Sequence, residues 1–158
     1  EMLGRKAQLG SNVHAAIAEH SKCEFFPLTE AEQGYFDSYL KWKDAVNLKP
    51  IECELRLYLD AMMITGCVDM LGMIGDSLDW RLIDFKCTAQ EDPVKWPLQA
   101  SLYNLILAQR GFPLNQSAIF VRLDKNGDLP SVYEYKLTNQ LLEVAVSAYN
   151  IFKYLTKK

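Results

Sequence analysis

Two aspartates and a lysine are the residues best suited to do chemistry in this chain. Residues 79–86 (DWRLIDFK) alternate as a strand does, which puts Asp84 and Lys86 on one face. Asp69 lies in the preceding apolar run, where an unpaired carboxylate is costly to bury. Two carboxylates on neighbouring strands repel one another, and a divalent cation relieves that repulsion. The pattern therefore predicts a divalent-cation site suited to Mg²⁺, with Lys86 beside the acids.

An ion pair without a metal is the simpler interpretation of the same residues. A single aspartate on a strand is more often part of such a pair. The occurrence of Asp69, Asp84 and Lys86 together favours the metal site, because Mg²⁺ takes oxygen ligands and keeps waters that a phosphate can displace. A bound cation acidifies water and neutralises phosphate, while a lysine orients the attacking water or stabilises developing charge. These residues thus suit hydrolysis of a phosphate ester.

A mixed α/β fold is needed to position these residues. The length of 158 residues suits one domain, and we expect a single domain over residues 1–158. Hydrophobic periodicity predicts two helices, three strands in an antiparallel meander, a helix, two strands and a closing helix. The expected helices are 11–20, 29–47, 97–110 and 138–157, and the expected strands are 51–60, 63–73, 79–86, 116–123 and 131–137.

Local signals predict where these elements begin and turn. Ser11 or Asn12 is the expected N-cap of the first helix, and Thr29 with Glu32 forms a capping box for the second. The pair at 126–127, Asn-Gly, predicts a hairpin between the last two strands. Alternation in the first strand places five apolar side chains on one face. These are Ile51, Cys53, Leu55, Leu57 and Leu59.

The acid on one strand and the acid-x-lysine on the next resemble the core motif of the PD-(D/E)XK nuclease superfamily. Val68 stands where that motif has proline. Gln99 and Tyr103 form a Q-x-x-x-Y motif on the helix after the D-x-K strand, which is similar to the RecB-type branch. The spacing puts both side chains on one helix face. Taken alone, a core-facing tyrosine and a helix-favouring glutamine would explain this pair.

A G-x-x-x-H motif on the first helix, Gly10 and His14, resembles the RecB-type and lambda-exonuclease-type branches. Four residues place the glycine on the face of the histidine, where it leaves room for close approach. A lone polar histidine on an amphipathic helix is the alternative. Glu54, on the strand before Asp69, is a further candidate, although ordinary solvated alternation explains it equally.

The resemblance implies a restriction-endonuclease-like core, a mixed β-sheet flanked by helices. It also implies a metal site for Mg²⁺ or Mn²⁺ held by His14, Asp69, Asp84 and the backbone carbonyl of Phe85, with Glu54 as a possible addition.

The catalytic residues implied by the resemblance are Asp69, Asp84, Lys86, Gln99 and Tyr103. Lys86 would position or activate the attacking water. Gln99 and Tyr103 would support the site and contact the nucleic-acid strand.

Composition argues against several other classes. The chain is 49% hydrophobic and 23% charged, as soluble globular proteins are, with no apolar run long enough to span a bilayer and no secretory signal. We therefore expect a cytoplasmic protein with no membrane partner. The four cysteines are irregularly spaced without a C-x-x-C pair, so neither a zinc site nor an iron–sulfur cluster is expected. Reduced, intracellular thiols fit best.

The net charge of −3 is low for a protein that binds nucleic acid, but the charge is unevenly distributed. Residues 51–92 carry nine acids and three bases, while the rest of the chain carries fourteen bases and eleven acids. An acidic centre between mildly basic ends is compatible with a metal site inside a rim that tolerates phosphate. An ordinary acidic protein could show the same distribution by chance.

These features predict a metal-dependent DNA nuclease, expected to be an exonuclease of recombination, repair or replication, with phages as one source. DNA is the expected partner. No helicase motif occurs, so a helicase or recombination protein would be a separate partner. The alternative is a non-catalytic nucleic-acid-binding or interaction module that retains the nuclease fold. Metal-dependent cleavage would separate the two.

Overall fold

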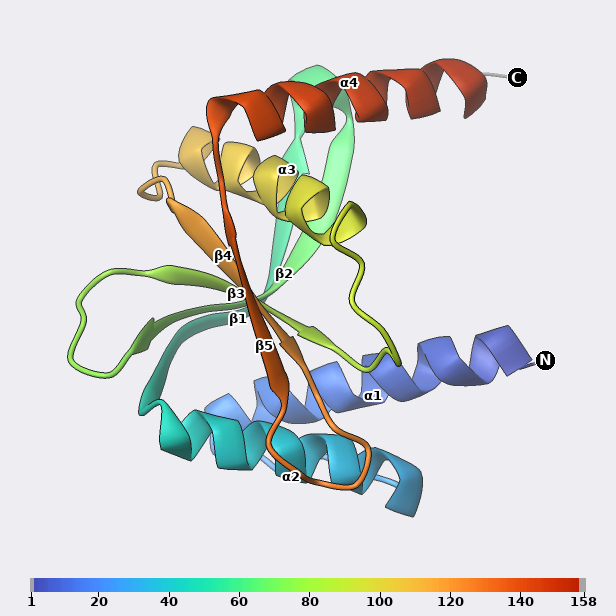
Figure 1. Ribbon diagram of the computed structural model, residues 1–158, viewed down its shortest axis with the longest axis vertical. Helices are drawn as coiled ribbons and strands as arrows, with labels where there is room; N and C mark the ends of the chain where they lie inside the picture. Colours follow the sequence, from blue (N-terminus) through green and yellow to red (C-terminus); the bar gives the residue numbers. More distant parts are fainter. Residues whose placement is uncertain (1, 157–158) are drawn as a thin grey trace.

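The computed structural model describes residues 2–156 as a five-stranded sheet between two pairs of helices (Figure 1). The strands lie in sequence order, and all neighbours are antiparallel except β3 and β4, which run parallel because the helix α3 connects them. The elements are α1 (Met2–Ser21), α2 (Glu30–Ala45), β1 (Leu48–Leu59), η1 (Asp60–Met62), β2 (Ile64–Ile74), β3 (Arg81–Lys86), α3 (Lys95–Gln109), β4 (Ser117–Arg122), β5 (Ser131–Lys136) and α4 (Asn139–Thr156). The expected mixed α/β fold, with its antiparallel meander, is confirmed.

Helices α1 and α2 cover one face of the sheet, below it in Figure 1. The fully buried ring of Tyr39 and the nearly buried ring of Trp42 both contact Phe85 edge-on, with ring centres 5.3 and 6.0 Å apart. The aromatic stripe of α2 is therefore core. The other buried residues of this layer are Val13, Ile17, Leu48, Met70, Ile83, Ile119, Val121 and Leu123.

Helices α3 and α4 cover the opposite face, where a second core lies. Trp96 of α3 stacks on Phe120 of β4 with ring centres 5.2 Å apart. Its other buried residues are Leu57, Ile64, Val68, Leu71, Leu82, Ala100, Ile106, Leu107 and Ala118. Two packed layers on one sheet hold β3 rigidly between them, and β3 carries Asp84 and Lys86.

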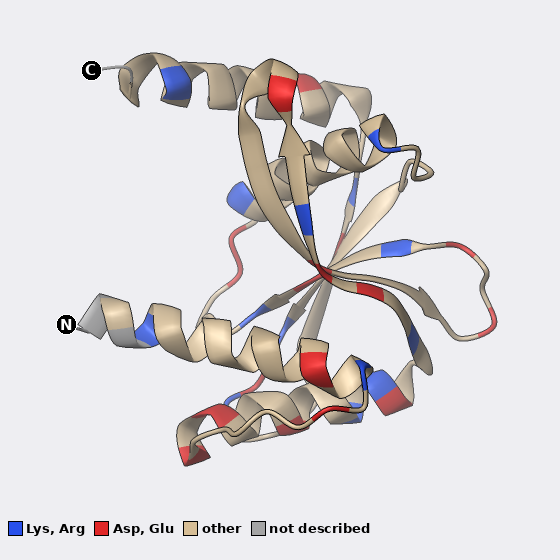
Figure 2. Ribbon diagram, turned by 180° about the vertical axis from the view of Figure 1, so that it is seen from behind, with Lys and Arg blue, Asp and Glu red and all other residues tan. Residues whose placement is uncertain are grey.

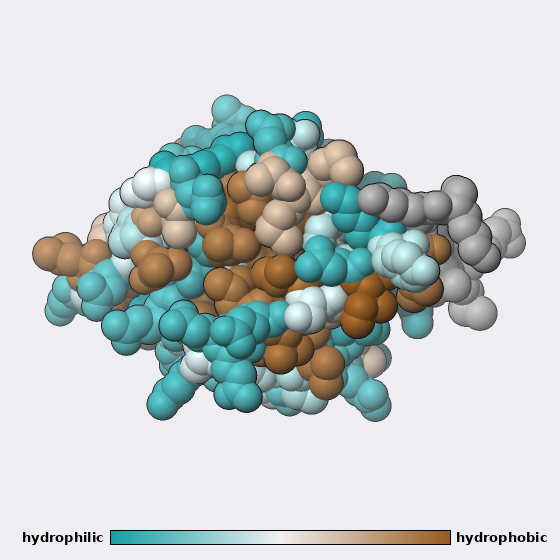
Figure 3. Space-filling model, turned by 90° about the horizontal axis from the view of Figure 1, so that it is seen from above, coloured by the Kyte–Doolittle hydropathy of each residue, from teal (hydrophilic) through white to brown (hydrophobic). Residues whose placement is uncertain are grey.

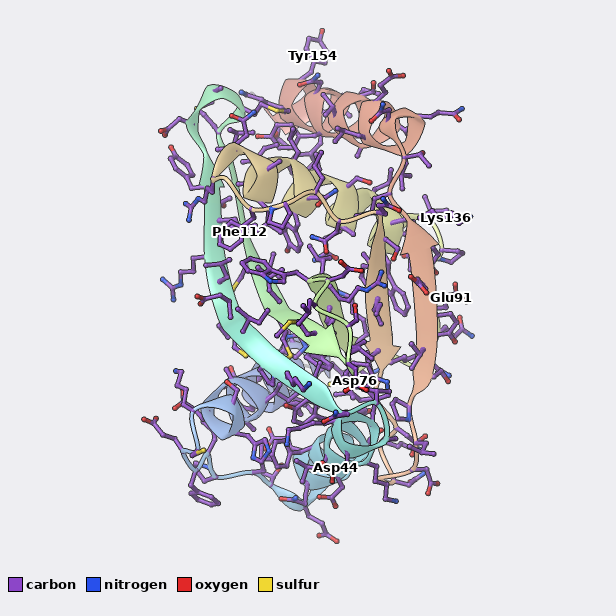
Figure 4. All side chains as sticks on the ribbon, turned by 90° about the vertical axis from the view of Figure 1, so that its left-hand side faces the viewer. Asp44, Asp76, Glu91, Phe112, Lys136 and Tyr154 are labelled. Atoms are coloured by element: carbon purple, nitrogen blue, oxygen red, sulfur yellow. The ribbon has the colours of Figure 1, made fainter. Side chains whose placement is uncertain are left out.

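The outer side of α4 leaves apolar side chains exposed. Tyr149 ties the helix to the β1–β2 hairpin by donating its hydroxyl to the carbonyl of Met62 at 2.8 Å. Figure 3, seen from the α4 side, shows apolar side chains on this surface, and Tyr154 points away from the body of the molecule in Figure 4. The exposed large apolar residues of α4 are Val144, Ile151, Phe152, Tyr154 and Leu155. Within residues 2–156, no helix is long and apolar enough to cross a membrane.

The first helix is longer than expected. It begins at Met2, so neither Ser11 nor Asn12 is its N-cap. Ser11 lies inside the helix and donates its hydroxyl to the carbonyl of Ala7 at 3.1 Å. The prediction relied on Ser11 and Asn12 as residue types that favour the N-cap, whereas the residues between Gly4 and Gly10 are good helix formers that extend the helix toward the N-terminus.

The predicted capping box of α2 and the predicted turn between β4 and β5 are confirmed. The backbone N–H of Thr29 donates to Glu32 Oε2 at 2.8 Å, and Asn12 donates to the other oxygen of Glu32 at 2.7 Å, which ties α1 to the start of α2. Gly127 takes the left-handed backbone that the β4–β5 turn requires, with φ 81°.

The simple alternation expected along β1 is wrong. Cys53 packs with the α1–α2 core, whereas Leu55 and Leu59 pack with the α3–α4 core, which also contains the buried Leu57. Glu54, between the two groups, has a left-handed φ of 51°, which breaks the two-residue period of the strand. The strand also changes register against β2 between Pro50 and Glu52. Figure 4 shows the resulting long, curved hairpin, which runs from α2 to α4.

Candidate metal centre and active site

Strands β2 and β3 separate at Asp69, and this separation opens the candidate site. Their backbone pairing ends at Met70 opposite Ile83. Beyond that point the backbone N–H of Phe85 donates to the Asp69 carboxylate, with an N–Oδ2 distance of 2.8 Å. A side chain thus replaces a main-chain acceptor, and the Asp69 carboxylate occupies the gap between the strands.

The backbone of Phe85 faces this gap. In a strand, the N–H and C=O of one residue point to the same edge, so the Phe85 carbonyl is directed to the side on which its N–H meets Asp69. The buried Phe85 ring, held between Tyr39 and Trp42, fixes this part of β3. The expected carbonyl ligand is therefore oriented toward the gap.

Three side chains from three elements converge at this gap. His14 of α1, Glu54 of β1 and Asp69 of β2 each offer a ligand atom, and these atoms lie within 4.8 Å of one another. His14 Nδ1 is 3.2 Å from Asp69 Oδ1. Glu54 lies opposite Asp69, because its neighbours Cys53 and Leu55 pair with Met70 and Val68. Its left-handed backbone is found at this point of β1. One nitrogen and two carboxylates form a donor set that suits a divalent cation.

Asp84 lies next to this group but makes different contacts. It is only 2% exposed, and its Oδ2 is 2.6 Å from the ammonium of Lys86. Lys86 is the partner of this buried oxygen, and no other described residue donates a hydrogen bond to it. A cation bound at this oxygen would have to replace its contact with Lys86. The ion pair proposed as the simpler interpretation thus exists between Asp84 and Lys86, while Asp69 pairs with His14.

Gln99 and Tyr103 contact the site from α3. The Gln99 amide donates to Tyr103 Oη at 2.9 Å and to Asp84 Oδ1 at 3.4 Å, and its oxygen accepts from Lys86 at 3.3 Å. The Tyr103 ring lies against β2, where a Cβ on Gly66 would be only 2.4 Å from the ring. The sequence motif therefore forms one hydrogen-bonded chain that orients Asp84 and Lys86. Gly66, which leaves space for the ring, was not identified from the sequence.

Neighbouring charge and burial shift the protonation of this cluster. Burial, with the charge of Asp69, raises the pKa of Asp84 to about 7 despite the opposing effect of Lys86. Burial lowers the pKa of His14, but Asp69, Asp84 and Glu54 together outweigh it, so that this pKa is raised. The repulsion expected between Asp69 and Asp84 is thus present.

A bound cation would have to displace protons from this cluster, so we expect its affinity to rise with pH. Between the unfolded pKa of 3.8 and about 7, folded Asp84 holds a proton that the unfolded chain releases. Its contribution to stability is therefore lost as pH rises through that window, and the raised pKa of His14 acts in the same direction above 6.5. The increase in melting temperature that Mg²⁺ produces should be larger at pH about 8 than at about 6. Equal shifts at both pH values would contradict this assignment.

Most of the residues predicted from the sequence meet at this gap. His14, Glu54 and Asp69 converge, and Asp84, Lys86, Gln99 and Tyr103 form the adjoining hydrogen-bonded cluster. Cys67 was not identified from the sequence as part of the site, yet its Sγ lies 3.4 Å from Glu54 Oε2. Its position two residues before Asp69 was the available signal.

A family model described as the PD-(D/E)XK nuclease superfamily matches residues 27–150. The match includes β1 to β5 and every site residue except His14 of α1, whose inclusion depends on its sequence motif and on its position beside Asp69. No curated protein matches the chain significantly.

Proposed function

Because the chain belongs to the PD-(D/E)XK nuclease superfamily, we propose that it hydrolyses phosphodiester bonds of DNA with Mg²⁺ or Mn²⁺. The observation that carries this proposal is the convergence of His14, Glu54 and Asp69 beside the buried Asp84–Lys86 pair. If Asp84 and Lys86 formed only a structural ion pair, the nearby convergence of His14, Glu54 and Asp69 would have no role in it.

The proposed cation would be held by His14, Asp69, Asp84 and the Phe85 carbonyl, with Glu54 as an additional ligand. When bound, it would acidify a water molecule and neutralise charge on the attacked phosphate. Asp84 must turn from Lys86 to bind it. Lys86 keeps its hydrogen bond to Gln99, so its freed ammonium stays close enough to hold the attacking water and to stabilise charge on the phosphate.

The finer assignment is to the RecB and lambda-exonuclease type. It is supported by the Gln99–Tyr103 contacts and by the presence of His14 at the gap. An exonuclease of this type would act in the cytoplasm in recombination, repair or replication, with a helicase or recombination protein supplied as a separate chain. A phage source is part of the same proposal.

A cleavage assay tests the activity directly. Linear duplex and single-stranded DNA labelled at either end would be incubated with Mg²⁺, Mn²⁺ or EDTA and resolved on a gel. Metal-dependent release of mononucleotides would support an exonuclease, and internal fragments an endonuclease. Binding of DNA without cleavage under every metal condition would overturn the proposal in favour of the non-catalytic module.

Substitutions of Gln99 and Tyr103 should lower the cleavage rate while changing the metal affinity little. Gln99→Met keeps the volume but removes the bonds to Asp84 and Lys86, so cleavage should fall by roughly tenfold or more, as expected for lost hydrogen bonds to charged groups. Tyr103→Phe should have a smaller effect, because only its hydroxyl contact is lost. Calorimetry should give nearly unchanged metal affinity for both variants. Equal losses of metal binding would show that α3 supplies ligands and is misassigned here.

A further inference from the structure

A groove adjoins the candidate site along α1. It has a volume of about 280 Å³ and lies between one face of α1 and the end of β3 with the residues that follow. His14 and Lys86 belong both to this groove and to the site, so the two are continuous. Lys6, Gly10 and Ser11 extend the α1 wall, and Thr88 lies on the opposite wall. The volume is slightly below the usual range for small-ligand pockets, which suits one small unit of a larger ligand.

The charge of the groove points to an anion. Its lining contains no aspartate or glutamate, and of its two lysines Lys86 is paired with Asp84, so Lys6 is the lysine that gives the groove uncompensated positive charge. Lys6 makes no ion pair among residues 2–156. Figure 2 shows a basic segment, coloured blue, near the start of α1. No tryptophan or tyrosine lines the groove, and the ring of Phe85, which does, is fully buried. The groove therefore offers a lysine for a phosphate but no broad stacking platform for a base.

Gly10 has no structural reason to be glycine. A Cβ at Gly10 would meet nothing within 4 Å, and its backbone is ordinary helix. Gly34, also inside a helix, differs, because a Cβ there would lie 1.9 Å from the carbonyl oxygen of Lys125. Glycine is an unfavourable residue within a helix. Gly4 has the same open surroundings but lies outside the groove, so what distinguishes Gly10 is where its open space lies. That space is part of the groove.

We propose that this groove binds the sugar-phosphate backbone of the nucleic-acid strand next to the scissile phosphate. Gly10 keeps its wall low enough for the strand, and Lys6 binds a neighbouring phosphate. Lys6, Gly10 and His14 follow one another at intervals of four residues, about 6 Å each along the helix, so they form a straight track that leads to the site. The inference rests on the proposed function for the identity of the strand.

Gly10→Leu tests the groove, and Gly4→Leu is its matched control. Gly4 lies on the same helix, and a Cβ there also meets nothing within 4 Å, but Gly4 does not line the groove. Both variants should raise the melting temperature by about 2–4 °C, since leucine is the better helix former. Only Gly10→Leu should weaken binding of a fluorescent single-stranded DNA oligonucleotide in Ca²⁺, by about tenfold or more. Unchanged affinity in Gly10→Leu would overturn the proposal.

Lys6→Ala gives an independent measurement. The dependence of log affinity on log salt should become shallower by about 0.7 for the single strand, as expected for one lost phosphate contact. Lys41→Ala, which removes an exposed lysine of α2 outside the groove, should leave the slope unchanged. An equal change in both slopes would contradict a specific contact. Full competition by inorganic phosphate, with no advantage for the oligonucleotide, would show a simple anion site and also overturn the proposal.

The outcomes separate this inference from the proposed function. Cleavage by the wild-type chain with no effect of Gly10→Leu on binding or rate would refute the groove and leave the nuclease intact. Binding that depends on Gly10 and Lys6 without cleavage would support the groove and refute the nuclease. Calorimetric titration with Mn²⁺ should give the same metal affinity for Gly10→Leu and Gly4→Leu. A loss of metal binding in Gly10→Leu alone would mean that the substitution disturbs His14, and would remove the support for a strand site.

Discussion

Asp69→Asn should abolish detectable Mg²⁺ or Mn²⁺ binding in a calorimetric titration, and with it all metal-dependent cleavage. Asp69 is the carboxylate that meets both His14 and the backbone of Phe85 in the gap between β2 and β3. Asparagine has the same shape but no charge, so the cation would lose its central ligand. The affinity should fall by more than the roughly 10- to 100-fold that follows loss of a residue that only supports a ligand.

Stability distinguishes a metal ligand from a member of a structural ion pair. Without added metal, Asp69→Asn should be about as stable as the wild type. The amide oxygen can still accept from Phe85, and the lost attraction to His14 is offset by lost repulsion of Asp84. The pKa of Asp84 should fall from about 7, which NMR titration can follow. Asp76→Asn, an exposed acid in the turn after β2, is the charge-matched control and should bind metal normally. Undiminished metal affinity in Asp69→Asn, or a large loss of its stability, would favour the ion pair.

Lys86→Ala should slow cleavage by a factor on the order of 10² to 10³, as loss of a preorganised electrostatic donor does. Lys86 is mostly buried, with its ammonium 2.6 Å from Asp84 and 5.5 Å from the centre of the Phe120 ring. A charged ammonium cannot be a metal ligand, so the affinity for Mg²⁺ should be unchanged or higher at pH about 8, where Asp84 is ionised. DNA affinity in Ca²⁺ should change little, because one phosphate contact among several is a small part of the total.

Two controls protect this prediction from a simple folding defect. Lys86→Met retains the aliphatic stem over Phe120 and should show the same loss of rate. Without a partner, the buried Asp84 should destabilise both variants in EDTA, and Mg²⁺ should restore more stability to them than to the wild type. Lys95→Ala removes an exposed lysine at the start of α3 and should leave the rate unchanged. Cleavage at the wild-type rate by Lys86→Ala would refute the proposed mechanism even if the fold is right.

The elements with strong local signals were predictable. The aspartate and lysine of β3 were assigned to one face by alternation alone, and the hairpin after β4 by its Asn-Gly pair. The start of α1 and the alternation of β1 were not. The first failed because Ser11 and Asn12, which favour N-caps, lie inside a helix that good helix formers extend back to Met2. The second failed because a single residue, Glu54, adopts a left-handed φ. Neither event has a reliable signature in residue types.

Residue type and spacing determined which side chains could act together within one element: Asp84 with Lys86 on a strand, Gln99 with Tyr103 and Gly10 with His14 on helices. Periodicity is a property of the local backbone, so the sequence contains it. The tertiary structure decided which elements meet. Only the separation of β2 from β3 brings Asp69 to Phe85, and only the packing of α1 on the sheet brings His14 to Asp69 and Glu54. It also decided that Asp84 pairs with Lys86 rather than joining that group, because burial makes an unpaired carboxylate too costly.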